Sequence, residues 1–149
     1  MRKLMLLSML LFAAATPFVQ LSAQGPSAGA EDAAVRAAIE HYMRGHATGD
    51  GAHHRKVFHL ESKLFFVREG KFSQRTSEEY IAGHKGTPPA DEAQRQRRID
   101  WIDVTGDAAV AKLTLTYPEV TFTDYMSLLK IDGEWKIVNK TFHADRRKK

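Results

Sequence analysis

Apolar, β-branched and aromatic residues fill three long runs between Arg98 and Phe142, and turn-forming residues separate the runs. The separators are Gly106-Asp107, Pro118 and Asp132-Gly133, which are typical of tight turns or strand edges. The pattern predicts an antiparallel meander of long strands. Strands this apolar must be covered on at least one face, so we expect a curved sheet packed against preceding helices.

The region before the meander has helical periodicity. One apolar stripe predicts a helix from Glu31 to about Gly49, with members Val35, Ala38, Ile39, Tyr42, Met43 and His46. Asp50 is expected to cap a second, short helix, and Thr76 or Ser77 a third. Strands are expected at 60–67 and 71–75. This order of elements predicts an α+β fold, with a curved antiparallel sheet forming a cone closed by N-terminal helices.

The N-terminus has the pattern of a secretory signal peptide. Arg2 and Lys3 precede the apolar run Leu4–Ala15, and small residues follow at Leu21-Ser22-Ala23. The run is shorter than the about 20 residues that a membrane-spanning helix needs. We therefore expect cleavage before Gln24 and a periplasmic or secreted protein without a membrane span. The predicted organisation is a signal peptide at 1–23, a flexible linker at 24–30, one domain at 31–145 and a basic tail at 146–149.

Composition narrows the classes of partner. The chain contains no cysteine, so its core must hold without disulfides. The formal net charge of the whole chain is +4. The signal peptide and the C-terminal tail together carry more positive charges than this net charge. The folded body is therefore slightly acidic, and we expect no nucleic-acid partner.

The motifs of metal and covalent chemistry are absent from the sequence. Its seven histidines show neither HxH nor HExxH spacing, His53 and His54 are expected on a solvated helix, and His46 is expected to be a satisfied core histidine. No nucleophile elbow or phosphate-binding glycine loop occurs. We expect no metal and no cofactor.

Several segments carry a family resemblance. They are Gly49-Asp50, Val57-Phe58-His59, residues 99–104 and 106–110, and above all FTDYMSLLKIDGEWKIVNKTF at Phe122–Phe142. These segments resemble the nuclear-transport-factor-2-like (NTF2-like) superfamily, in the branch of secreted bacterial proteins called "putative lumazine-binding". The resemblance covers nearly all of the mature chain and implies a cone-shaped domain with an internal cavity.

The resemblance also implies where an enzyme would keep its catalytic groups. Isomerases of this superfamily place a tyrosine on the first helix, a carboxylate base on the first strand and an acid on a late strand. Tyr42 matches the tyrosine, whereas the base position falls near Phe65-Phe66 and the acid position near Ser127. Two of the three roles are unfilled, so we do not expect isomerase chemistry.

Strand alternation predicts the cavity face. A tight turn at Asp132-Gly133 would place Tyr125 opposite Lys140, with Ser127 on the same face. We assign that face to the cavity because a buried Tyr42 needs a polar partner. The predicted ligand-binding residues are Tyr42, His46, Trp101, Tyr125, Ser127 and Lys140. The expected ligand is small, partly aromatic, and neutral or acidic.

The same alternation turns Phe122, Asp124, Met126 and Leu128 outward, which predicts a homodimer through the last two strands. Three function classes stay open, because one fold hosts all of them. The sequence favours a small-molecule binding protein. The alternatives are an isomerase- or dehydratase-type enzyme that uses the cone, and a structural homodimeric module without a ligand.

Overall fold

A computed structural model describes residues 28–147 of the chain. The predicted signal peptide and its cleavage site, residues 24–27 of the predicted linker and the last two residues of the tail lie outside the described residues. Among residues 28–147, no helix has both the length and the apolar character needed to cross a membrane.

Three α-helices, a short 3-10 helix and six strands make up the described chain, and they confirm the α+β prediction. The helices are α1 (Ala28–Thr48), α2 (Gly51–Val57) and α3 (Ser77–Ala82), with the 3-10 helix at Glu92–Gln94. The strands are β1 (Phe58–Arg68), β2 (Lys71–Thr76), β3 (Gln96–Thr105), β4 (Ala108–Tyr117), β5 (Val120–Ile131) and β6 (Glu134–Arg146). Helix α1 thus begins at Ala28, within the stretch expected to be a linker, and β6 includes the first residue of the expected tail.

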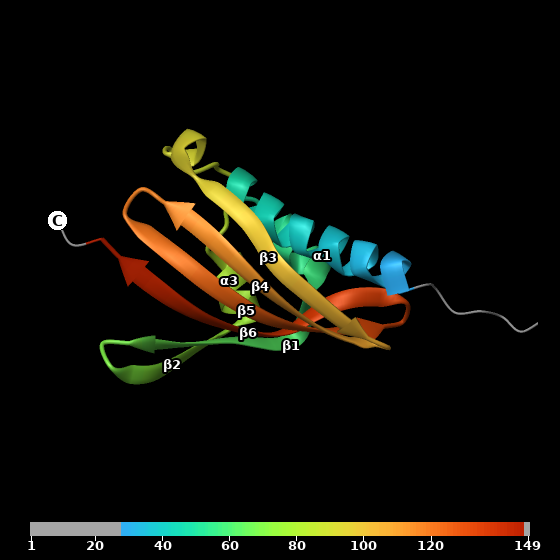
Figure 1. Ribbon diagram of the computed structural model, residues 1–149. Coiled ribbons are helices and arrows are strands. Elements are labelled where there is room, and N and C mark those ends of the chain that lie inside the picture. The colour runs from blue at the N-terminus through green and yellow to red at the C-terminus, as the bar shows by residue number, and fades with distance from the viewer. Residues whose placement is uncertain (1–27, 148–149) are drawn as a thin grey trace, which may run out of the picture.

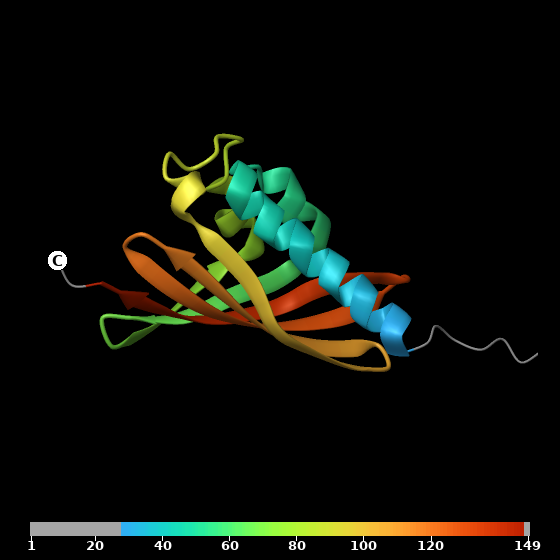
Figure 2. The same cartoon turned by 45° about the horizontal axis from the view of Figure 1, so that its top comes forward.

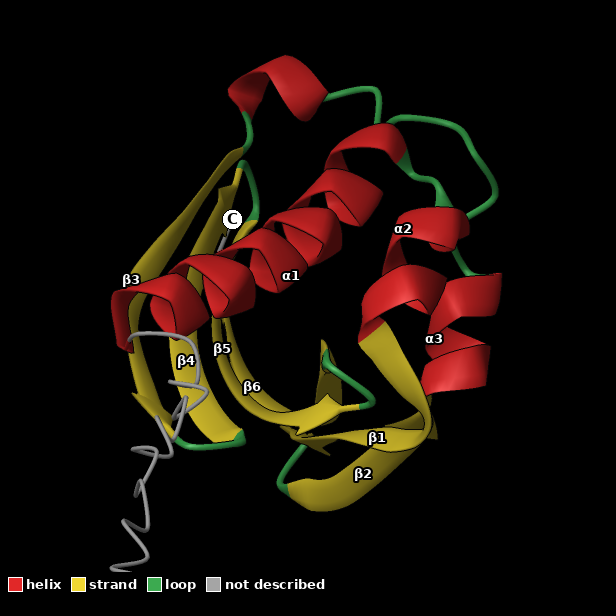
Figure 3. Ribbon diagram, turned by 90° about the vertical axis from the view of Figure 1, so that its right-hand side faces the viewer, coloured by secondary structure: helices red, strands yellow, loops and turns green. Residues whose placement is uncertain are grey.

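The strands form one sheet in the order β2-β1-β6-β5-β4-β3. Neighbouring strands are antiparallel except β1 and β6, which pair in parallel across the middle of the sheet. The sheet curves strongly, and α1 runs diagonally across its concave side (Figures 1 and 2). Viewed along the hollow, α2 and α3 stand beside α1 opposite the curved strands (Figure 3). The sheet is mixed and unclosed, and the helices cover its open side.

Local signals start the helices as the sequence predicts. The Asp50 carboxylate accepts a 2.8 Å hydrogen bond from the Ala52 amide at the start of α2. Thr76 and Glu79 form a reciprocal capping box at the start of α3. The Asp132-Gly133 turn of the last hairpin has φ angles of 51° and 82°, which allow a tight reversal.

The core lies between α1 and the concave face of the sheet. Val35, Ile39 and Tyr42 of the predicted stripe are fully buried. Below them lie buried apolar side chains of β4, β5 and β6: Leu113, Leu115, Met126, Leu128, Trp135 and Ile137. At the N-terminal end of α1, Glu31 accepts hydrogen bonds from Lys130 and from the Trp135 indole. The first half of α1 is therefore fixed to the last hairpin.

A β-bulge in the last hairpin overturns the predicted cavity face. The turn at Asp132-Gly133 forms as expected, and pairing is regular as far as Leu128 opposite Ile137. The next pair is Ser127 with Asn139, so Val138 is an extra residue on β6. Lys140 consequently lies opposite Met126 rather than Tyr125. Because side chains alternate, a shift of one residue exchanges the two faces of the strand.

The shift also removes the surface on which the predicted dimer was based. Asp124, Met126 and Leu128 point into the domain and are at most 2% exposed, and the partly buried Phe122 packs against the core. The prediction that these four side chains face outward is therefore wrong.

Candidate functional site

A cavity of about 660 Å³ lies between the concave face of the sheet and the helices. Its volume is in the usual range for small-molecule sites. Polar groups at its inner end are Tyr42, His46, Tyr80 and Lys140, and apolar walls come from Leu64, Phe66, Leu115, Phe122 and Phe142. The Phe66 and Phe142 rings stack with their centroids 4.8 Å apart. The wall can therefore pack against a flat ligand, while the inner end offers hydrogen bonds.

Three buried side chains form what we call the charged cluster: Tyr42 of α1, Asp124 of β5 and Lys140 of β6. The Lys140 ammonium lies 2.9 Å from Asp124 Oδ2. The Tyr42 hydroxyl donates a 2.7 Å hydrogen bond to the same carboxylate oxygen and accepts one from Lys140. Asp124 is fully buried and Lys140 is 4% exposed. The cluster joins the C-terminal half of α1 to the two strands that carry the bulge.

The low-polarity surroundings shift the protonation equilibria of this cluster. Burial lowers the pKa of Lys140, although the negative charge of Asp124 and its hydrogen bond oppose the shift. Burial also raises the pKa of Tyr42 well above its usual range, with a further contribution from Asp124. The Oδ1 atom of Asp124 has no hydrogen-bond partner among the described residues. The cluster thus offers the cavity an amine that is easier to deprotonate than an exposed lysine.

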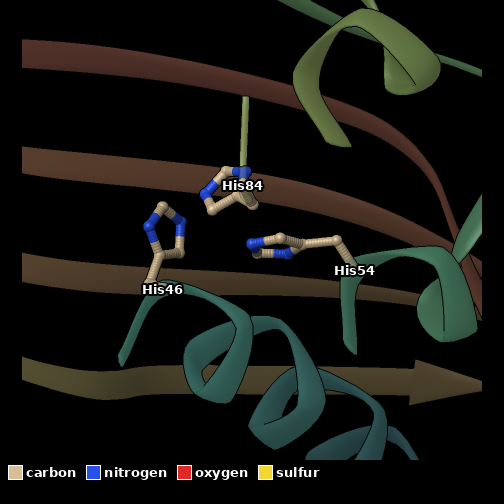
Figure 4. Close-up of side chains that lie close together, drawn as sticks. All are labelled: His46, His54 and His84. Atoms are coloured by element: carbon tan, nitrogen blue, oxygen red, sulfur yellow. The ribbon is translucent and has the colours of Figure 1, made fainter. Parts of the chain in front are cut away.

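Beside the charged cluster lies a histidine cluster, which consists of His46, His54 and His84 (Figure 4). Burial lowers the pKa of each, and brings that of His54 to about 3. These imidazoles are therefore neutral near pH 7. The Tyr80 hydroxyl lies 2.7 Å from His46 Nε2. The centroid of the Tyr42 ring lies 4.8 Å from that of His46 and 5.3 Å from that of His54, so the two clusters meet at the inner end of the cavity.

The mouth of the cavity is mostly basic. Arg68, Glu69, Arg75 and Arg146 line it, and all four are exposed. The Arg68 guanidinium lies over the Phe66 ring, 5.3 Å from its centroid. Three arginines against one glutamate favour the approach of an acidic molecule.

The structure separates the six predicted ligand-binding residues into two groups. Tyr42, His46 and Lys140 line the cavity together. Trp101, Tyr125 and Ser127 line a groove of about 230 Å³ on the opposite, convex face of the sheet. Trp101 and Tyr125 are 45% and 46% exposed there. The expectation that all six share one concave space is wrong, and the bulge at Val138 explains it for Tyr125 and Ser127.

Sequence reasoning missed Asp124 and Tyr80 at the inner end. Asp124 was assigned to the outer face by the register error, although a carboxylate inside an apolar strand is itself a signal of a buried partner. His54 was expected on a solvated helix, but its side chain is fully buried. His54 lies three residues before the buried Val57 of α2, a spacing that places both side chains on one face of the helix.

Comparison with known families agrees with this architecture. Residues 30–143 match the family described as "putative lumazine-binding". The chain belongs to this family. The match spans the domain from the first turns of α1 to the last strand, so the family assignment covers both clusters and the cavity.

Solved structures of other proteins share the fold of this chain. An NTF2-like protein of unknown function from Shewanella baltica superposes with a TM-score of 0.75 at 23% identity, over 83% of this chain and 100% of that one. Another, from Methylobacillus flagellatus, gives 0.69 at 28% identity, over 80% and 95%. A curated relative named Aldolase FrzH, from a Cladobotryum species, is 26% identical over 113 residues, which cover 74% of this chain and 89% of the relative.

Proposed function

We propose that this protein is an exported small-molecule binding protein that takes a partly aromatic, acidic or carbonyl-bearing ligand into its concave cavity. The buried Lys140, held at the inner end of an otherwise mostly apolar cavity, carries this proposal. A single buried cation orients a ligand by charge and hydrogen bonding, while aromatic walls supply most of the contact area. Lumazine, the compound in the family's name, is one aromatic carbonyl compound of this kind.

Native mass spectrometry of protein purified from its secretory compartment tests for a retained ligand. Isothermal titration with lumazine and with benzoate then tests the two expected features, the carbonyl and the acid. Arg75→Gln at the exposed mouth should weaken benzoate binding, because it removes one positive charge from the entrance. Lys63→Met, on an exposed lysine outside the lining of the cavity, is the matched control and should bind as the parent does. A cavity that retains nothing and binds neither probe would contradict the proposal.

Export is part of the proposal and rests on the N-terminal sequence. The run Leu4–Ala15 followed by Leu21-Ser22-Ala23 supports cleavage before Gln24. N-terminal sequencing of the exported protein should begin at Gln24. A chain that keeps Met1 and stays with the membrane fraction would contradict this part.

Enzymatic activity is the second candidate function, and Asp124 is the observation that favours it. The sequence suggested no carboxylate inside the cone, yet Asp124 lies 2.9 Å from Lys140 in hydrogen-bonded contact with Tyr42. A desolvated lysine with a lowered pKa can attack a carbonyl and form an imine with loss of water. The similarity to a protein named Aldolase FrzH agrees with carbonyl chemistry. Borohydride reduction in the presence of pyruvate should then leave a covalent adduct on Lys140, located by peptide mass spectrometry.

We also propose a homodimer, through the convex face of the sheet. Trp101, Val110, Tyr125 and Leu129 are each more than 40% exposed on strands β3, β4 and β5. An exposed apolar patch formed by these side chains on a sheet is suited to packing against the same patch of a second copy of the protein. This surface replaces the one predicted from Phe122, Met126 and Leu128.

A further inference from the structure

Three histidines from separate segments converge beneath α1. His46 lies in the last turn of α1, His54 lies in α2, and His84 follows α3. Figure 4 shows the three rings gathered around one small space. One nitrogen atom from each ring lies within 4.8 Å of the other two. The fold thus assembles a group that no sequence spacing predicts.

His54 has hydrogen-bonding capacity that the described residues leave unused. Its side chain is fully buried, and neither Nδ1 nor Nε2 has a hydrogen-bond partner among them. A neutral imidazole carries one donor and one acceptor, and burying both without partners is costly. Buried polar groups in native proteins are nearly always satisfied, so an unsatisfied ring indicates that something else binds there.

The surrounding backbone keeps room for this ring and fixes its neighbour. A Cβ atom on Gly45 would lie 2.6 Å from His54 Nε2, so only glycine leaves space for the ring. The Gly51 amide donates to the His84 carbonyl at 3.3 Å, which joins the segment after α3 to the start of α2. His84 Nδ1 lies 3.1 Å from the Tyr80 carbonyl. An N–H bond to a carbonyl at Nδ1 leaves the Nε2 lone pair of His84 free to bind a metal, as in many metal sites.

We propose that His46, His54 and His84 bind a divalent transition metal, with Zn²⁺ the preferred ion. Neutral imidazoles suit zinc, cobalt, nickel and copper, whereas calcium and magnesium prefer oxygen ligands. Three protein ligands leave a fourth position open, as in catalytic zinc sites. Zinc–nitrogen bonds of about 2.1 Å require the three nitrogens to be about 3.4 Å apart. The rings need to close in by about an ångström or somewhat more from their present positions.

The proposed metal site borders the ligand cavity. His46 and Tyr80 line both the cavity and the histidine cluster. A metal at the cluster would therefore lie next to the groups that a ligand reaches first at the inner end of the cavity. The metal site does not depend on the proposed binding function, because a protein can hold the ion whether or not the cavity takes a ligand.

Metal uptake by untagged, chelator-treated protein tests the proposal. Titration with Co²⁺ should produce visible absorption bands that reach a plateau at one equivalent, and native mass spectrometry with Zn²⁺ should show one bound ion. Loss of an outer-shell partner typically weakens metal binding by about 10–100-fold. His84→Ala removes a direct ligand and should weaken binding by at least as much. His84 is only partly buried, so this variant is the one best suited to keep the fold, which circular dichroism verifies.

Two partly buried histidines outside the cluster supply the matched control. His41 and His53 lie with their Nδ1 atoms 3.3 Å apart outside the cluster and could hold a metal adventitiously. His53→Ala should leave the uptake of one equivalent unchanged, and His46→Gln should reduce it as His84→Ala does. The proposal is overturned if the parent takes up no stoichiometric metal. It is equally overturned if His84→Ala and His46→Gln bind as the parent does, or if His53→Ala abolishes uptake.

Discussion

The charged cluster and the histidine cluster meet at the Tyr42 ring, yet they satisfy their polar atoms to different degrees. In the charged cluster, Lys140, Tyr42 and one oxygen of Asp124 bond to one another. In the histidine cluster, His54 makes no hydrogen bond to any described residue, although its ring is 5.3 Å from that of Tyr42.

The difference teaches that burial alone does not define a site. A network that pairs its two charges can position groups and hold a fixed charge, even though Asp124 Oδ1 has no partner among the described residues. A buried ring with two unpartnered nitrogens is incomplete as it stands, and something else must compensate for its burial. Mutations and pH changes should therefore affect the two clusters in different ways.

Removal of one partner from the charged cluster should have the largest effect. Lys140→Met leaves Asp124 as a buried charge without its cation, and should lower the free energy of unfolding by about 3–5 kcal/mol. Lys63→Met, at an exposed position, should change it by no more than about 0.5 kcal/mol. Urea unfolding followed by circular dichroism measures both.

A paired variant sharpens this result. Lys140→Met combined with Asp124→Leu removes both charges and should recover most of the lost stability, because apolar replacements of buried ion pairs are often tolerated. If the single variant loses less than about 1 kcal/mol, Asp124 is not left as an unpaired charge and the two clusters are more alike than the geometry indicates.

Gly45→Ala should disturb the histidine cluster alone. Alanine is favoured over glycine inside a helix by up to about 1 kcal/mol, but the added Cβ would lie 2.6–2.8 Å from the His54 ring. Overpacking of this kind costs about 1–3 kcal/mol, so we expect a net loss of stability. Gly29→Ala is the matched control in the same helix, where nothing lies within 4 Å of the new methyl group. Thermal unfolding of both variants tests the difference, and equal stabilisation of the two would contradict the tight fit of His54.

Acidification should weaken the metal-free protein through the histidine cluster. The pKa of His54 is about 3 in the folded protein and 6.5 in an unfolded chain. Between these values the unfolded state binds more protons, so stability present above pH 6.5 is lost as the pH falls. The slope from His54 should be about 1.4 kcal/mol per pH unit within that window.

Burial is the main cause of the low pKa of His54, and His84, Lys140 and His53 lower it further. The ring centroids of Tyr42, His46 and Tyr80 also lie within 5.3 Å of that of His54. Unfolding measured in chelator-containing buffer from pH 7 to pH 4 gives the slope directly. His54→Leu should reduce the slope, whereas His143→Ala, at an exposed position, should not. A parent protein whose stability does not change over this range would show that His54 is not buried as a neutral ring.

Tyr125→Lys on the convex face should have the smallest effect on folding. Tyr125 is 46% exposed, so the free energy of unfolding should change by no more than about 0.5 kcal/mol. A lysine there places a charge in the middle of the proposed dimer surface and should shift the protein toward monomer in sedimentation equilibrium. A parent that is already monomeric at high concentration would exclude this interface.

Most of the fold could be predicted from the sequence, because helix periodicity, helix caps and turn residues each act within a few residues. The helical stripe of α1, the caps at Asp50 and Thr76 and the turn at Asp132-Gly133 all form as expected. The candidate site was predicted only in part, because its geometry depends on contacts between distant segments. Tyr42, His46 and Lys140 were correctly placed at the cavity, although the argument that placed Lys140 there paired it with Tyr125.

Two features lay beyond sequence reasoning for physical reasons. A β-bulge depends on the energetics of the whole curved sheet, and no residue near Val138 is of a type that predicts a bulge. The meeting of His46, His54 and His84 depends on how α2 and the segment after α3 pack under α1, over sequence separations of 8 to 38 residues. Such contacts have no fixed spacing, so no motif can represent them.

The extra residue at Val138 changes which positions of β6 point toward the inside of the domain. Before it, Trp135 and Ile137 face the core, and after it Lys140 does, so inward positions change from odd to even numbers. A relative that lacks this residue would keep the same inward side chains in a straighter strand. Alignments of family members through this hairpin therefore need a gap at Val138 wherever the bulge is absent. Without that gap, every comparison of cavity residues beyond it would match an inner side chain with an outer one.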